Sequence, residues 1–192
     1  GRTLTLSEHI DRTTFPGLQG TPYLNNAAAK AVFFKETLSE AYKARQFKII
    51  SNAQRLAGAL IDLGYDVLTG GTDNHIVLMN VSDLRPGPHG GGALTGAAAQ
   101  KALEQCGIIV NMNRLPYDTK SAGVTSGLRL GTPIVTKNGM GDAEMEAIAG
   151  LIDAVLRGAE PIGEMDCRVD VRLRDQITAK VVELCRTFPM RW

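Results

Sequence analysis

The chain has 192 residues, of which 44% are hydrophobic, and a formal net charge of +1. This length and apolar fraction suffice for a packed core, whereas the nearly neutral charge argues against nucleic acid or an anionic membrane as a partner. No apolar run approaches the roughly 20 residues of a membrane span. Three cysteines and three histidines are scattered without metal-ligand or disulfide spacing, so we predict no metal site and a cytoplasmic location.

The first third of the chain is predicted to be a short strand, a loop and a long helical segment. Alternation predicts a strand at residues 3–6, and a loop punctuated by Gly and Pro follows at 15–22. From about residue 25 to 63 there is no Pro, and Gly58 is the one Gly. This segment is predicted to be one very long helix or two nearly continuous ones, and we interpret it as a connector.

Short strands and helices follow, separated by Gly- and Pro-rich turns. We predict strands at 65–68, 75–81, 108–113 and around Arg129. We predict a helix capped by Thr95 that runs to Gln105, one at 143–157 capped by Asp142, and one at about 170–185. The intervening loops are at 70–73, 82–92 and 115–123, with a linker through Pro161 and Gly163. This order predicts a small α+β domain with a largely antiparallel sheet.

The run from Ser126 to Pro133, Ser-Gly-Leu-Arg-Leu-Gly-Thr-Pro, places an arginine between small and apolar residues in a strand-like segment. A guanidinium held on a strand is suited to bind a carboxylate, because it is planar, permanently charged and donates two parallel hydrogen bonds. The alternative is a surface arginine on an edge strand.

Four motifs occur here in one order: Phe-Pro-Gly-Leu-Gln-Gly before the alanine-rich helix, Gly-Gly-Thr-Asp-Asn-His, Asn-Met-Asn, and the arginine run. Together they resemble the C-terminal half of serine hydroxymethyltransferases, over the whole chain including the tail Val-x-Glu-Leu-Cys-x-x-Phe-Pro. The resemblance implies an α/β protein of the fold-type I pyridoxal-phosphate transferases. It also implies that residues 1–24 are the end of the large cofactor-binding domain. Residues 25–63 would then be a connecting helix, and residues 64–192 a small C-terminal α+β domain.

The resemblance also implies an activity and a role for Arg129. The family interconverts serine and glycine, with pyridoxal 5'-phosphate as the electron sink and tetrahydrofolate as the one-carbon acceptor. Arg129 matches the arginine that binds the α-carboxylate of the amino acid. A fixed carboxylate aligns the bond to be broken with the cofactor, so this role agrees with the chemistry.

Three further residues match binding positions of the family. Gly20 and Thr21 match a glycine pair whose backbone amides reach the cofactor phosphate of a neighbouring subunit; Thr21 replaces the second glycine, and the alternative is a plain loop turn. Asn113 matches the residue that hydrogen-bonds the folate pteridine, and its alternative is an asparagine that bonds local backbone. Ser-Ala-Gly at 121–123 departs from the Ser-Pro-Phe frequent in the family, and Tyr117 is also variable, so the folate pocket is the weakest match.

Two residues of the Gly-Gly-Thr-Asp-Asn-His motif are expected to be structural. Asp73 can form an Asx turn, and a lone histidine such as His75 is usually satisfied locally.

The family's catalytic Schiff-base lysine has no counterpart in this chain. Its Thr-x-x-Lys-Thr motif would precede Gly1, and the remaining lysines match nothing catalytic: Lys30, Lys35, Lys43 and Lys48 on the long helix, and Lys120 and Lys137 in loops. We therefore expect no catalytic residue in this chain and no activity when it is alone. The expected partner is the N-terminal half of the enzyme, in the same or a separate chain, within a homodimer or higher oligomer.

Two alternatives to a hydroxymethyltransferase remain. The altered 121–123 segment leaves room for a folate-independent aldolase or transaldolase that acts on threonine-like substrates. The missing lysine leaves room for a non-catalytic partner subunit. We also expect residues 1–23 and the long helix to bury apolar surface against the absent half.

Overall fold

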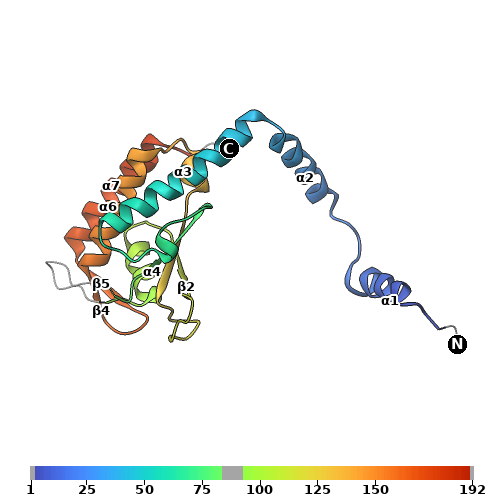
Figure 1. Cartoon of the computed structure of the whole chain (residues 1–192), viewed down its shortest axis with the longest axis horizontal. Coiled ribbons are helices and arrows are strands. Elements are labelled where there is room, and N and C mark those ends of the chain that lie inside the picture. The colour runs from blue at the N-terminus through green and yellow to red at the C-terminus, as the bar shows by residue number, and fades with distance from the viewer. Residues whose placement is uncertain (1–2, 84–92, 191–192) are drawn as a thin grey trace. The chain divides into compact units, whose positions relative to one another are not determined.

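A computed structural model describes residues 3–83 and 93–190 of the chain (Figure 1). They fall into two compact units, unit 1 at residues 1–43 and unit 2 at 44–192. The predicted loop at 82–92 lies almost wholly outside the described residues. Among the helices that are described, none is long and apolar enough to cross a membrane.

Unit 1 has no strand at residues 3–6, and helical turns extend into the first part of the loop predicted at 15–22. Helix α1 (Leu6–Arg12) begins at Thr5, whose hydroxyl accepts the Glu8 amide while the Glu8 carboxylate accepts the Thr5 amide at 2.8 Å. This capping box outweighs the alternation that predicted a strand at 3–6, so that prediction is wrong. A short π-helical turn, Thr13–Leu18, occupies the first part of the predicted loop.

The predicted long helical segment is two helices, as one form of the prediction allowed. Helix α2 (Leu24–Thr37) ends before helix α3 (Glu40–Asp62) begins. Ser39 lies at the break, where its hydroxyl donates to the Glu36 carbonyl at 2.7 Å and accepts the Tyr42 amide at 3.2 Å. A serine that satisfies the end of one helix and the start of the next favours a break at this point.

Unit 2 contains the predicted antiparallel sheet. Its strands are β1 (Ile76–Asn80), β2 (Asn111–Asn113) and β3 (Gly127–Gly131), in the order β1-β3-β2, with β3 antiparallel to both neighbours. The helices of the unit are α3, α4 (Gly96–Gln105), α5 (Pro133–Lys137), α6 (Asp142–Gly158) and α7 (Val171–Thr187). Unit 2 therefore mixes helices with a small sheet, as the sequence predicted.

One face of the sheet is buried in the core of unit 2. Val77 and Met79 of β1 and Leu128 of β3 have no exposed surface, and Leu130 has little. They pack with apolar side chains from the helices, among them Leu60 of α3, Leu103 of α4 and Ile152 of α6. Strand residues alternate between faces, so the other face of the sheet carries the residues between these.

Two predicted strands are shorter than expected. The segment 65–68 forms only a bridge between Val67 and Met79, and the chain then turns through Leu68–Gly70. The segment 108–113 is a strand only over β2, because the Ile108 amide still bonds the Leu103 carbonyl at the end of α4. Turns that close helix and strand ends take up the rest of both segments.

The predicted cap of α4 is present and that of α6 is not; α7, for which no cap was predicted, begins at Asp170. Thr95 accepts the Ala98 amide at 3.1 Å, and Asp170 accepts the amides of the first turn of α7. Helix α6 begins after Gly141, whose amide donates to the Glu144 carboxylate at 2.7 Å. Asp142 does not cap it, because its carboxylate accepts the Lys48 ammonium instead.

The predicted linker through Pro161 and Gly163 contains a hairpin. Strands β4 (Ala159–Pro161) and β5 (Cys167–Val169) pair antiparallel between α6 and α7. Three-residue strands give too short an alternation to be recognised from sequence.

Candidate functional site

The exposed face of the sheet brings together two of the predicted binding residues. Arg129 of β3 lies opposite Asn111 of β2 and Leu78 of β1, and Asn113 lies opposite Gly127. Directly opposed residues of an antiparallel pair project to the same face, and so do residues two apart on one strand. Arg129 and Asn113 therefore share this face as diagonal neighbours, about 7–8 Å apart.

The backbone of Arg129 is fixed in β3, whereas its side chain is bound by no other described residue. Its neighbours Leu128 and Leu130 are buried, with exposed fractions of 0% and 5%, while Arg129 itself is exposed. Within the described residues the guanidinium makes no hydrogen bond or ion pair, and all five of its N–H donors remain available. A fixed backbone with an unpaired guanidinium fits a carboxylate-binding role better than a structural ion pair.

Asn113 is half-buried and partly satisfied by local backbone. Its amide nitrogen donates to the Arg114 carbonyl at 2.7 Å, and Asn111 makes the same kind of bond to Met112 at 2.6 Å. This is the local alternative considered for Asn113, and it fixes the orientation of the amide. The Asn113 amide oxygen accepts no hydrogen bond from the described residues, so it can still bind a donor on a ligand.

Gly127 lets the loop after β2 lie close to the start of β3. A β-carbon there would lie 3.0 Å from the Asn113 carbonyl oxygen and would overlap the Leu115 side chain. A glycine two residues before Arg129 is therefore required by packing.

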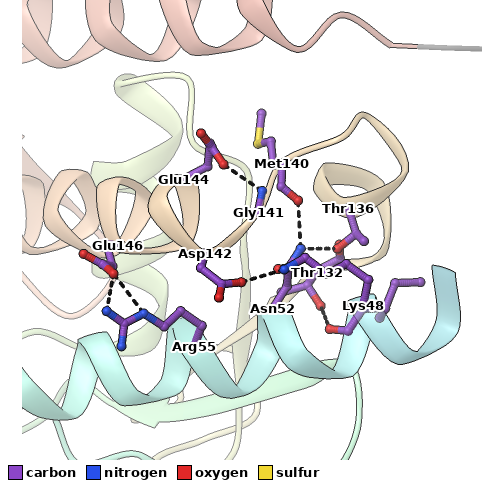
Figure 2. Close-up of polar contacts among 11 residues, drawn as sticks. Lys48, Asn52, Arg55, Thr132, Thr136, Met140, Gly141, Asp142, Glu144 and Glu146 are labelled. Carbon is purple, nitrogen blue, oxygen red and sulfur yellow. Dashed lines mark hydrogen bonds and ion pairs between the residues drawn. The ribbon is translucent and has the colours of Figure 1, made fainter. Parts of the chain in front are cut away.

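The end of β3 is tied to the long helix α3 by buried hydrogen bonds (Figure 2). The Thr132 hydroxyl, just after the strand, donates to the Ile49 carbonyl of α3 at 2.8 Å. Asn52, with no exposed surface, donates to the Thr136 hydroxyl at 2.8 Å and to the Met140 carbonyl at 3.0 Å. Unsatisfied partners are costly when buried, so these bonds fix where the arginine strand ends.

Two exposed ion pairs lie beside this buried network in Figure 2. Lys48 of α3 contacts Asp142 at 2.6 Å, and Arg55 contacts Glu146. The ammonium of Lys48, through its hydrogen bond and its charge, holds the pKa of the Asp142 carboxyl below its ordinary value. Lys48 is thus a surface ion-pair residue.

Asp118 was not singled out from the sequence, yet it organises the loop between β2 and β3. Its carboxylate accepts four hydrogen bonds, from the amides of Leu115, Lys120 and Ser126 and from the Ser126 hydroxyl. Partial desolvation raises the pKa of this carboxyl, but the hydrogen bonds outweigh it and lower the pKa to about 2. An aspartate in a Gly- and Pro-containing loop was the available signal.

Gly20 and Thr21 belong to unit 1 and are not part of this sheet. Both are exposed, and a β-carbon on Gly20 would meet nothing within 4 Å. The packing of the described residues therefore does not require a glycine here. The exposed backbone at Gly20 leaves room for the predicted approach of an anion, and the binding itself stays a prediction.

The predicted Asx turn is present but is made by another residue, and within the described residues no hydrogen bond satisfies the His75 imidazole. The Asx turn before β1 is made by Asn74, whose side chain accepts the Ile76 amide at 2.8 Å, rather than by Asp73. His75 is exposed, and Lys120 contacts Glu164 at 3.3 Å. No cluster of three metal-binding side chains occurs within residues 3–83 and 93–190.

The sequence of the chain is similar to those of known proteins. The family model described as serine hydroxymethyltransferase matches residues 1–152. A curated serine hydroxymethyltransferase of Methanosarcina barkeri is 38% identical over 189 residues. That alignment covers 98% of this chain and 42% of the relative, so the chain spans less than half the length of that relative.

Proposed function

Because the chain belongs to the serine hydroxymethyltransferase family, we propose that it forms part of a glycine hydroxymethyltransferase. Such an enzyme interconverts serine and glycine and uses tetrahydrofolate as the one-carbon acceptor. The observation that carries the proposal is that Arg129, unpartnered within the described residues, lies on the same face of the sheet as Asn113. An amino acid substrate and a folate must lie close together in this reaction, and these two side chains can bind one each.

Arg129 would bind the α-carboxylate of serine or glycine. Its guanidinium can make two parallel charge-assisted hydrogen bonds, which set the orientation of the amino acid as well as its affinity. Buried Leu128 and Leu130 keep the backbone beneath it in place. The substrate is thereby held in one orientation toward the reacting centre.

Asn113 would bind the pteridine of tetrahydrofolate through its free amide oxygen. Pteridine carries N–H groups that suit such an acceptor, and the bond to Arg114 holds the amide in place.

Pyridoxal 5'-phosphate, when bound, supplies the electron sink for the reaction. The exposed, unhindered backbone at Gly20 and Thr21 fits a phosphate contact, because amide hydrogens can approach an anion closely there. We propose that the lysine that anchors the cofactor comes from the N-terminal half of the enzyme, in the same or a separate chain. We also propose that the enzyme is a homodimer or higher oligomer and that it is located in the cytoplasm.

Exposed apolar side chains of unit 1 support such a partner. No described residue from 3 to 43 is buried, although the segment is rich in large apolar side chains. Those exposed by more than half are Leu6, Ile10, Phe15, Leu18, Tyr23, Leu24, Val32, Phe34 and Leu38. Apolar surface of this extent is unfavourable in water and is typical of an interface.

Reconstitution tests the proposal. The chain is mixed with its matching N-terminal half and pyridoxal 5'-phosphate, and visible absorbance of the bound cofactor is recorded. Restored absorbance, with serine cleavage accelerated by tetrahydrofolate, is the expected result. Failure to restore absorbance would indicate a non-catalytic partner subunit.

A folate-independent aldolase is the second candidate. Residues 121–123 are exposed and Tyr117 is fully exposed, so these four residues build no apolar wall beside Asn113. An aldolase would cleave its β-hydroxy amino acid equally fast with and without tetrahydrofolate.

A further inference from the structure

The loop that joins β2 to β3, residues 114–126, is closed by one carboxylate. Asp118 Oδ2 accepts the amide of Leu115 at 3.2 Å and the amide of Ser126 at 2.8 Å, and thus bonds to both ends of the loop. Its Oδ1 accepts the Lys120 amide at 2.9 Å and the Ser126 hydroxyl at 2.8 Å. Ser126 immediately precedes β3, so Asp118 joins the exit from β2 to the entry of β3.

The loop adopts backbone conformations that its residues disfavour. Tyr117 and Thr125 have positive φ values of 59° and 54°, although neither is glycine. The Thr125 hydroxyl is buried and has no hydrogen-bond partner among the described residues. Such conformations persist only where surrounding bonds impose them, and the four bonds of Asp118 span this segment.

The two predicted binding residues depend on the loop to different degrees. Asn113 is the last residue of β2, a three-residue edge strand that pairs only with β3. Arg129 is in the middle of β3, which pairs with β1 as well as β2. Opening the loop therefore frays Asn113 first and leaves Arg129 in place.

We propose that Asp118 is a positioning residue for the folate side of the site. By closing the loop it fixes Asn113 relative to Arg129, and it sets the affinity for the pteridine without contacting it. This inference rests on the proposed function, in which Asn113 binds tetrahydrofolate.

The test uses Asp118→Ala in the reconstituted enzyme with its N-terminal half and cofactor. The KM for tetrahydrofolate is expected to rise about tenfold, the loss of roughly one hydrogen bond, while the KM for serine changes less than about threefold. Asp118→Asn retains an oxygen acceptor for part of the donor set, so it should restore part of the affinity for tetrahydrofolate.

Asp153→Ala is the matched control. Asp153 is also a partly buried carboxylate, bonded to the Tyr65 hydroxyl at 3.0 Å and to Arg157 Nε at 2.6 Å, but it lies on α6. Its loss should lower the thermal midpoint without changing the ratio of the two KM values. An Asp118→Ala enzyme in which both KM values rise equally, or neither rises, would overturn the positioning role.

Amide hydrogen exchange separates this inference from the proposed function. In Asp118→Ala, residues 111–126 should exchange faster while β1 and the centre of β3 keep their protection. Unchanged exchange at Asn113 would refute the positioning role whatever the activity. If the wild-type enzyme cleaved serine equally fast with and without tetrahydrofolate, the proposed function would be refuted, and with it the folate role of Asp118.

Discussion

In the described part of unit 2 many large apolar side chains are buried, whereas in the described part of unit 1 none is. Leu60, Leu103 and Leu128 have no exposed surface, while Leu18 is 78% exposed and Phe34 is 62% exposed. Unit 2 thus has a core that can position Arg129 and Asn113 by itself. Unit 1 presents the predicted phosphate contact on a segment without a core, so that contact depends on the rest of the enzyme.

The largest expected effect comes from comparing leucines of the two units. Leu60→Ala should lower the free energy of unfolding by about 2–5 kcal/mol, because it removes a fully buried side chain. Leu24→Ala, at a position 73% exposed, should change it by less than about 0.5 kcal/mol in the chain alone. Urea denaturation measures both. A large loss for Leu24→Ala would show that unit 1 has a core of its own.

Substitutions of two glycines in unit 2 test its packing, with smaller expected changes in the free energy of unfolding. Gly96→Ala should cost about 1–3 kcal/mol or more, because its β-carbon would overlap the Thr125 side chain and the Gly127 carbonyl. Gly58→Ala should stabilise the protein by about 0.5–1 kcal/mol, because it lies inside α3 with nothing within 4 Å of the new β-carbon. Thermal unfolding reports both changes, and equal effects would contradict this packing.

Gly20→Ala separates folding from cofactor binding in unit 1. The new β-carbon meets nothing within 4 Å, so the stability of the chain alone should not change. In the reconstituted enzyme the affinity for pyridoxal 5'-phosphate should fall about tenfold, since a side chain keeps the phosphate from the backbone. Titration of the visible absorbance measures this. Unaltered affinity would assign Gly20 to the loop alone.

The smallest effect is expected at the exposed pair of Lys48 and Asp142. The pKa of Asp142 is lowered, so any stability it contributes is present above its unfolded pKa and is lost as the pH falls through the folded value. Lys48→Met should remove that slight acid dependence and leave stability at neutral pH nearly unchanged. Unfolding midpoints between pH 3 and 7, roughly spanning ordinary carboxyl pKa values, would detect it. A marked loss at pH 7 would contradict a surface role.

Much of unit 2 could be predicted from the sequence because its signals are local. The alternation around Arg129 and the Thr95 cap each define an element within a few residues. The antiparallel sheet followed from their order along the chain. The sequence did not predict that Asn111 lies opposite Arg129, because the register of β2 and β3 depends on the loop that Asp118 closes.

The errors have different physical causes. At Thr5, Glu8 completes a reciprocal cap that outweighs the alternation at 3–6. At Gly141, the backbone amide donates to the Glu144 carboxylate, and this bond takes the place of the cap expected of Asp142. The β4–β5 hairpin is too short for any period to show. Buried polar bonds such as Asn52 to Thr136 join positions 84 residues apart, and no local pattern indicates them.

The most direct test of the site is the affinity of the reconstituted enzyme for serine with Arg129 replaced. Arg129→Ala should weaken serine binding by at least about 100-fold, from the loss of charge-assisted hydrogen bonds worth about 1.5–3 kcal/mol each, while cofactor absorbance persists. Arg168→Ala, an exposed arginine on β5, should change neither. Loss of the cofactor with unchanged affinity for serine would contradict the role of Arg129 as the carboxylate-binding residue.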